Sequence, residues 1–199
     1  MVTLILASRS FARRAMLDAA GVPHVAMAPG VDEDTAKAAM RAEGLDPRAL
    51  ADALAELKAV KLSRRHPGDL VLGCDQMLAT AEGGTLDKPE SREQAADQLR
   101  GLRGKTHRLI SAAVVCEAGA PIWRHVDVAK LSVRSFSDAF LERYLDAEWP
   151  AIGGCVGAYR LEGLGAQLFS RIEGSHFTIL GLPLLPLMDW LRLRGVLEA

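Results

Sequence analysis

The chain has 199 residues, of which 49% are hydrophobic and 25% charged, with a formal net charge of -1. This balance predicts a globular protein with its own core, and it argues against proteins that hold nucleic acid through bulk positive charge. Three scattered cysteines argue against a disulfide framework and a structural zinc site. With no signal-peptide pattern and no run near the roughly 20 residues of a membrane span, we expect a cytoplasmic protein without membrane or nucleic-acid partners.

The N-terminal segment predicts a strand, a turn and a helix. Residues 2–7 are apolar, and the helix after them has Ser10 as its N-cap and ends at Gly21. Ser10, Arg13 and Arg14 stand at i, i+3 and i+4, in a turn where the helix dipole disfavours cations. The two arginines therefore indicate either a phosphate-binding turn or a solvated basic turn.

A second strand is predicted over residues 24–28, followed by an acidic loop with Asp32, Glu33 and Asp34. Acidic loops are commonly just solvated. Carboxylates close to a phosphate site also suit magnesium, which takes oxygen ligands from one or two protein carboxylates and from substrate phosphates.

An amphipathic helix is expected from Pro47 toward His66. Lys58 and Lys61 lie at the edges of its apolar stripe, a position from which lysine normally extends to water. Their spacing alone assigns them no role.

The stretch around Asp75 carries the strongest functional signal. Residues 70–72 form an apolar run typical of a strand buried on both faces, and we expect that strand to end at Asp75 and Gln76. Ligands of open α/β sheets gather at the carboxyl ends of strands, so Asp75 is either a site residue or an acid that opens a turn. A turn at residues 83–84 predicts a hairpin that brings Lys88 back toward the same region.

The second half predicts a helix capped by Ser91, a long hairpin of residues 110–116 and 122–133, which makes the sheet mixed, and a helix capped by residues 135–137. Residues 149–157 predict a loop, residues 159–163 a strand end with Glu162, and residues 185–194 a final helix. The Gly-Lys-Thr of residues 104–106 is no P-loop, because Leu99 stands where that motif needs glycine and a strand follows where it needs a helix.

Eight short motifs in order resemble the Maf family of nucleoside triphosphate pyrophosphatases. They are Leu6-Ala7-Ser8-x-Ser10-x-x-Arg13-Arg14-x-x-Leu17, Val31-Asp32-Glu33, Leu54-Ala55-x-x-Lys58-Ala59, Asp75-Gln76, Lys88-Pro89, Gly104-Lys105-Thr106-His107, Glu162-Gly163, and Gly174-Ser175 with Gly181-Leu182-Pro183. The chain departs from the family pattern at Phe11, Asp87 and Ser111.

The resemblance implies a single domain over residues 1–199 with an α/β fold. The expected architecture is a mixed, twisted sheet with flanking helices and two lobes around a central nucleotide-binding cleft, similar to inosine triphosphatase. The family resemblance is compatible with a homodimer, but no stretch of the sequence identifies an interface.

The implied reaction is hydrolysis between the α and β phosphates of a nucleoside triphosphate, with Mg²⁺ or Mn²⁺. The resemblance assigns the grip on the triphosphate to Ser8, Arg13, Arg14, Lys58 and Lys88. It makes Asp75 the residue that activates water or holds the metal, with Glu33 assisting. A free aspartate is a poor base at neutral pH, so metal assistance or a raised pKa belongs to this hypothesis.

Three features resemble the 7-methyl-GTP branch of the family more than the dTTP/UTP branch. They are the spacing from Ser10 to Arg13, Gln76 after Asp75, and Glu162, whose carboxylate can accept hydrogen bonds from a guanine edge. The rival hypothesis is a regulatory protein linked to septum formation that binds nucleotides without turning them over. The retained acids and lysines argue against it.

Overall fold

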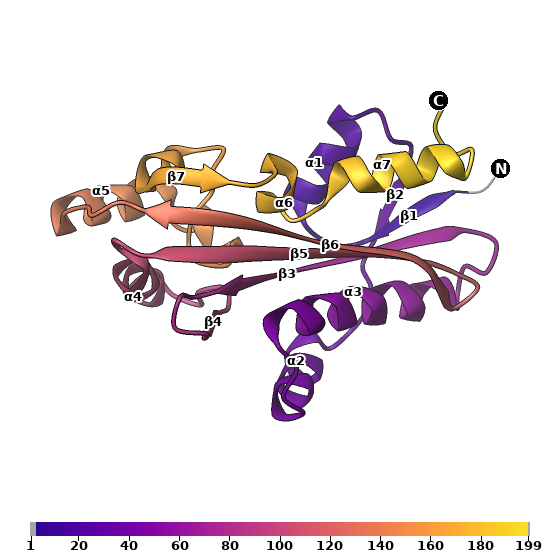
Figure 1. Cartoon of the computed structure of the whole chain (residues 1–199), viewed down its shortest axis with the longest axis horizontal. Helices are drawn as coiled ribbons and strands as arrows, with labels where there is room; N and C mark the ends of the chain where they lie inside the picture. Colours follow the sequence, from indigo (N-terminus) through magenta and orange to yellow (C-terminus); the bar gives the residue numbers. More distant parts are fainter. Residues whose placement is uncertain (1–2, 199) are drawn as a thin grey trace. The chain divides into compact units, whose positions relative to one another are not determined.

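The computed structural model describes residues 3–198 and holds one mixed sheet with the strand order β2-β1-β3-β5-β6-β7. β1 (Leu4–Ala7) runs parallel to β2 (Val25–Met27) and β3 (Leu70–Ala79). β4 (Thr85–Leu86) is antiparallel to β3, and β7 (Phe169–Glu173) is antiparallel to β6 (Ala120–Val133). β5 (Thr106–Glu117) lies between β3 and β6 (Figure 1). The mixed sheet confirms the prediction; Val2, expected in the first strand, lies outside the described residues.

Two compact units make up the chain, and each is described by itself. Unit 1 comprises Met1–Gln76, Ile110–Asp127 and Ser175–Ala199, and its helices are α1 (Phe11–Ala19), α2 (Glu33–Ala42), α3 (Pro47–Ser63), α6 (His176–Ile179) and α7 (Leu184–Leu193). Unit 2 comprises Met77–Leu109 and Val128–Gly174, and it contains α4 (Arg92–Leu102), α5 (Asp138–Glu148) and the 3-10 helices η1 (Ala151–Gly154) and η2 (Leu164–Leu168).

The core of unit 1 forms where α1 and α7 pack on strands β1 and β3. Leu6 and Leu72 of the strands are fully buried against Leu17 of α1 and Leu187 of α7. Figure 1 shows α1 and α7 on one side of these strands and α3 on the other. Because both faces are covered, β1 and residues 70–74 of β3 are continuously apolar, as the sequence indicated.

Helix α3 approaches β3 so closely that only glycine fits at position 73. A Cβ atom on Gly73 would lie 2.1 Å from the Ala55 carbonyl oxygen and 2.8 Å from the Ala59 nitrogen. Both are backbone atoms of α3, so no side-chain rotation could relieve the contact. This close packing brings the turn of α3 from Ala55 to Ala59, with Lys58 in it, directly onto the strand.

Three sequence expectations are corrected. The predicted acidic loop is the start of α2, because the Asp32 side chain accepts the Thr35 N–H as an N-cap and acids in a first helical turn are favoured by the helix dipole. β3 does not end at Asp75 but continues to Ala79. Residues 159–163 form no strand; a strand that the sequence analysis missed, β7, begins at Phe169.

Several local predictions are confirmed. Ser10, Ser91 and Ser137 cap α1, α4 and α5, each accepting a hydrogen bond from a backbone N–H three residues on. Gly21 has a φ of 65°, as expected for a glycine that ends a helix.

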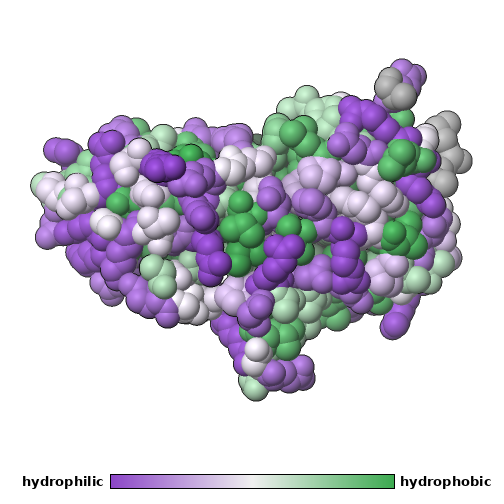
Figure 2. All heavy atoms as spheres, in the orientation of Figure 1, coloured by the Kyte–Doolittle hydropathy of each residue, from purple (hydrophilic) through white to green (hydrophobic). Residues whose placement is uncertain are grey.

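Within residues 3–198, no helix combines the length and apolarity needed to cross a membrane. On the face drawn in Figure 2, hydrophilic residues surround small apolar patches.

His107 lies in the core of unit 2. It is 1% exposed, its Nε2 is 2.7 Å from the Tyr159 hydroxyl, and its ring contacts those of Tyr159 and Phe169. Nδ1 has no hydrogen-bond partner among the described residues. Burial lowers the pKa of His107 from 6.5 to about 4, so the imidazole is neutral in the folded chain at neutral pH.

We expect Gly73→Ala to destabilise the protein by about 3 kcal/mol, because an added Cβ would force α3 away from β3. Chemical denaturation measures the free energy of unfolding. Gly68→Ala is the matched control in the same unit: its Cβ would meet no atom within 4 Å, and its effect should stay within about 0.5 kcal/mol. Equal stability of both variants would contradict the packing described.

Acid should destabilise the protein through His107. The unfolded chain takes up the proton near pH 6.5 and the folded chain only near pH 4, so stability is present above pH 6.5 and is lost as the pH falls toward 4. The loss amounts to about 3 kcal/mol. Denaturation at several pH values, compared with His107→Gln, isolates this contribution from the carboxylates. Parallel stability profiles of the wild type and His107→Gln would contradict this prediction, because they would mean that His107 has the same pKa in the folded and unfolded chains.

Candidate functional site

A buried lysine joins two predicted site carboxylates in unit 1. Lys58 on α3 is only 4% exposed, and its Nζ lies 2.7 Å from Asp75 Oδ1 and 2.7 Å from Glu33 Oε2. It also donates to the Cys74 carbonyl at 3.5 Å. Lys58 therefore does not extend to water, as a lysine at the edge of an apolar stripe normally does. A lysine buried at this depth requires paired charge, and the two acids supply it.

The second carboxylate oxygen of Asp75, Oδ2, is enclosed by the protein. Asp75 is 7% exposed, and Oδ2 has no hydrogen-bond partner among the described residues. A buried carboxylate oxygen without a donor is costly, so the site suits a ligand that brings a proton or a cation.

A divalent ion fits this arrangement only together with a ligand. The described residues contain no group of three or more His, Cys, Asp or Glu side chains that could hold a metal. Asp75 and Glu33 provide two carboxylates, and magnesium commonly uses one or two carboxylates plus substrate phosphates. The unused Asp75 Oδ2 is the donor expected for such an ion.

The turn between β1 and α1 is held by its two serines and Arg13. Ser8 Oγ accepts the Ser10 N–H at 3.1 Å, and Ser10 Oγ accepts the Arg13 N–H at 3.3 Å. The Arg13 guanidinium donates to Ser8 Oγ and to the carbonyls of Cys74 and Gly181, at 3.3, 3.0 and 2.8 Å. Arg13 thus fixes the turn against β3, whereas Arg14 is exposed.

Gln76 has both of its amide protons engaged within the protein. Its Nε2 lies 2.9 Å from Ser111 Oγ and 3.0 Å from the carbonyls of Thr178 and Ile179. Sequence reasoning noted Ser111 only as a departure and missed Thr178, which is fully buried and donates to Asp127. A buried hydroxyl residue inside an apolar run, as at Thr178, was the available signal. A role of Gln76 in substrate binding remains a prediction, through its Oε1.

Lys88 and Glu162 belong to unit 2, and both are exposed. Both act on the Cys155 thiol: burial raises its pKa, Glu162 raises it further, and Arg160 and Lys88 oppose the rise. The two predicted residues therefore share one neighbourhood within this unit. No described hydrogen bond or ion pair uses the Glu162 carboxylate.

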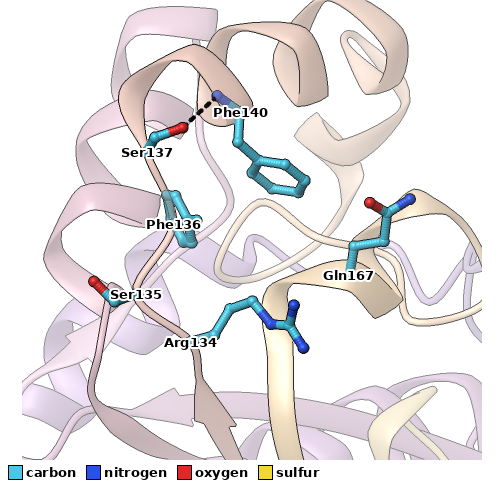
Figure 3. A pocket seen from close by; sticks show the side chains of 6 residues that line it. All are labelled: Arg134, Ser135, Phe136, Ser137, Phe140 and Gln167. Atoms are coloured by element: carbon cyan, nitrogen blue, oxygen red, sulfur yellow. Dashed lines mark hydrogen bonds between the residues drawn. The ribbon is translucent and has the colours of Figure 1, made fainter.

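The pocket in Figure 3 is separate from the predicted residues. It has a volume of about 400 Å³ and is lined by Arg134, Ser135, Phe136, Ser137, Phe140 and Gln167. The Arg134 guanidinium and the Phe140 ring point toward it in Figure 3. A second hollow of about 520 Å³, in unit 1, likewise contains no predicted site residue.

Known proteins of the same kind match this chain over nearly its full length. A protein from Caulobacter vibrioides is 54% identical over 197 residues, which cover 99% of this chain and 98% of that protein. Relatives from Sphingopyxis alaskensis and Ruegeria pomeroyi are 52% and 49% identical, with coverage of 98% or more of each chain. All three are named nucleoside triphosphate pyrophosphatase.

A solved structure of a HAM1 protein from Coxiella burnetii superposes with a TM-score of 0.41 at 13% identity, over 67% of this chain and 73% of that one. That likeness is too low to bear on function. The family profile described as Maf-like protein matches residues 3–194. With that match and relatives at about half identity along the whole chain, the protein belongs to the Maf family.

Proposed function

We propose that the protein is a nucleoside triphosphate pyrophosphatase that hydrolyses the α–β phosphoanhydride to a nucleoside monophosphate and pyrophosphate, with a preference for 7-methyl-GTP. The observation that carries the proposal is the Glu33–Lys58–Asp75 bridge, in which Lys58 and Asp75 are buried, Glu33 is half-exposed and one Asp75 oxygen is unused, in a chain whose relatives bear that enzyme name.

The bridge suits the activation of a water molecule. Lys58 holds Asp75 through Oδ1, which leaves Oδ2 either to accept the proton of a water molecule or to bind the metal ion. Phosphoryl chemistry asks a protein mainly to place charge and water, and exposed Arg14 and Lys88 are the cations proposed to contact the phosphates.

A divalent ion completes the proposed site. Asp75 and Glu33 are the residues that would hold Mg²⁺ or Mn²⁺, which when bound offsets negative charge on the phosphate oxygens. The backbone N–H groups and Ser8 at the start of α1 would orient the same phosphates.

The base preference rests on Glu162. Its carboxylate accepts hydrogen bonds only, which suits the N1–H and exocyclic amine of guanine and opposes a pyrimidine carbonyl. Methylation at N7 leaves positive charge on the purine ring, so the same carboxylate favours 7-methyl-GTP over GTP.

Pyrophosphate release should be strong with magnesium or manganese and absent with chelator. Asp75→Asn should lower kcat by about 100-fold or more, because the amide cannot accept the proton of water. Asp34→Asn, which changes an exposed acid next to Glu33, is the control and should stay within about twofold of the wild type. Nucleotide binding without turnover by the wild type would favour the regulatory function instead.

Substrate preference should change when Glu162 is neutralised. We expect Glu162→Gln to lower kcat/KM for 7-methyl-GTP by about 10-fold or more relative to UTP, since the amide places a donor against guanine donors. The measurement is kcat/KM for 7-methyl-GTP, GTP, dTTP, UTP, ATP and CTP. Glu173→Gln, an exposed acid in the same unit, should leave the preference unchanged. A wild-type preference for dTTP and UTP would reject the base assignment.

A further inference from the structure

Glu162 lies in an irregular segment whose shape depends on side-chain contacts. Residues 158–163 contain no helix or strand, and Ala158 has a φ of 58°. The backbone closes one turn there, with the Gly163 N–H donating to the Arg160 carbonyl at 3.3 Å. Such a segment has little rigidity of its own, so its conformation must be set by the residues that it contacts.

Glu148, the last residue of α5, clamps this segment on both sides of Glu162. Its Oε2 accepts hydrogen bonds from Arg160 Nε at 3.0 Å and Nη2 at 2.6 Å, and its Oε1 accepts one from the Leu164 N–H at 3.3 Å. Arg160 and Leu164 stand two residues before and two residues after Glu162. The two oxygens of one carboxylate therefore close a five-residue loop with Glu162 at its middle.

Glycine is required at position 165, just after the loop, and the glycine at 163 leaves room for the Glu148 carboxylate. A Cβ on Gly163 would lie 3.2 Å from Glu148 Oε1, and a Cβ on Gly165 would lie 2.3 Å from the Arg160 carbonyl oxygen. Upstream, the Tyr144 hydroxyl donates to the Ala158 carbonyl at 3.3 Å. The loop is thus packed tightly at its base, whereas Glu162 is exposed.

The burial of Glu148 is not explained by stability alone. It is 6% exposed, and a buried ion pair is often no more stabilising than apolar residues of similar volume. What the carboxylate supplies is direction, because two guanidinium N–H groups on Oε2 and a backbone N–H on Oε1 fix it in one orientation.

We propose that Glu148 is a positioning residue for base recognition, which holds the loop of residues 160–164 so that the Glu162 carboxylate meets the edge of a guanine nucleotide. This inference rests on the proposed function. Glu148 itself does not touch substrate; it acts through Arg160 and Leu164.

The test is a double-mutant cycle with Glu148→Gln and Glu162→Gln in the full chain, measuring kcat and KM for 7-methyl-GTP and UTP. Glu148→Gln turns an amide N–H toward Arg160 and should raise KM for 7-methyl-GTP about tenfold. The kcat and KM for UTP should stay within about twofold of the wild-type values. Added to Glu162→Gln, it should cause no further change in preference.

Two further variants separate positioning from damage. Glu142→Gln changes an exposed acid on the same helix, paired with Arg92 and Arg100, and should leave the preference unchanged. Arg160→Lys keeps the charge but loses the two guanidinium N–H groups that contact Glu148. It should shift the preference between 7-methyl-GTP and UTP in the same direction as Glu148→Gln, but by a smaller factor. It also provides the test if Glu148→Gln fails to fold. Amide hydrogen exchange over residues 158–166 should be faster in Glu148→Gln and in Arg160→Lys than in the wild type.

The outcomes are distinguishable. A wild type without turnover overturns the proposed function and this inference together. Relaxed preference in Glu162→Gln, with none in Glu148→Gln or Arg160→Lys, overturns the inference and leaves the proposed function standing. Equal losses on both nucleotides would show that Glu148 is merely structural, and they also overturn it.

Discussion

The contact on which unit 1 depends is the approach of helix α3 to strand β3 at Gly73. With no side chain at that position, the backbone of α3 at Ala55 and Ala59 can lie directly on the strand. The same turn of the helix then delivers Lys58 to the Cys74 carbonyl and to Asp75. A lysine held further away could not reach into the buried strand, and Asp75 would remain a buried charge without a partner.

The two units use buried ionisable groups in different ways. In unit 1 the buried lysine leaves one oxygen of its partner acid unused, so the pair retains chemical capacity. In unit 2 both oxygens of the buried acid Glu148 accept hydrogen bonds from protein donors, so this carboxylate holds the chain in place. His107 represents a third solution, a base kept neutral by burial alone.

Short sequence patterns correctly predicted the features that depend only on neighbouring residues, such as helix caps. Ser10, Ser91 and Ser137 cap helices because each cap is formed within four residues of chain. Tertiary contacts decided the rest. β3 continues past Asp75, whose charge is paired with Lys58 from a distant part of the chain, and nothing in the neighbouring residues reveals that pairing. β7 is an edge strand with a mostly exposed, non-alternating pattern, so periodicity could not identify it.

The guanidinium of Arg13 reaches one hydroxyl and two carbonyls that diverge from one another. An ammonium group of equal charge is a compact point that could satisfy only part of this set. The Gly181 carbonyl belongs to a residue whose φ is 97° and whose absent side chain leaves room for Arg13 itself. The two positions are therefore coupled: lysine at 13 would leave part of this acceptor set without a donor, and a Cβ at 181 would lie 3.3 Å from Nε and Nη2 of Arg13.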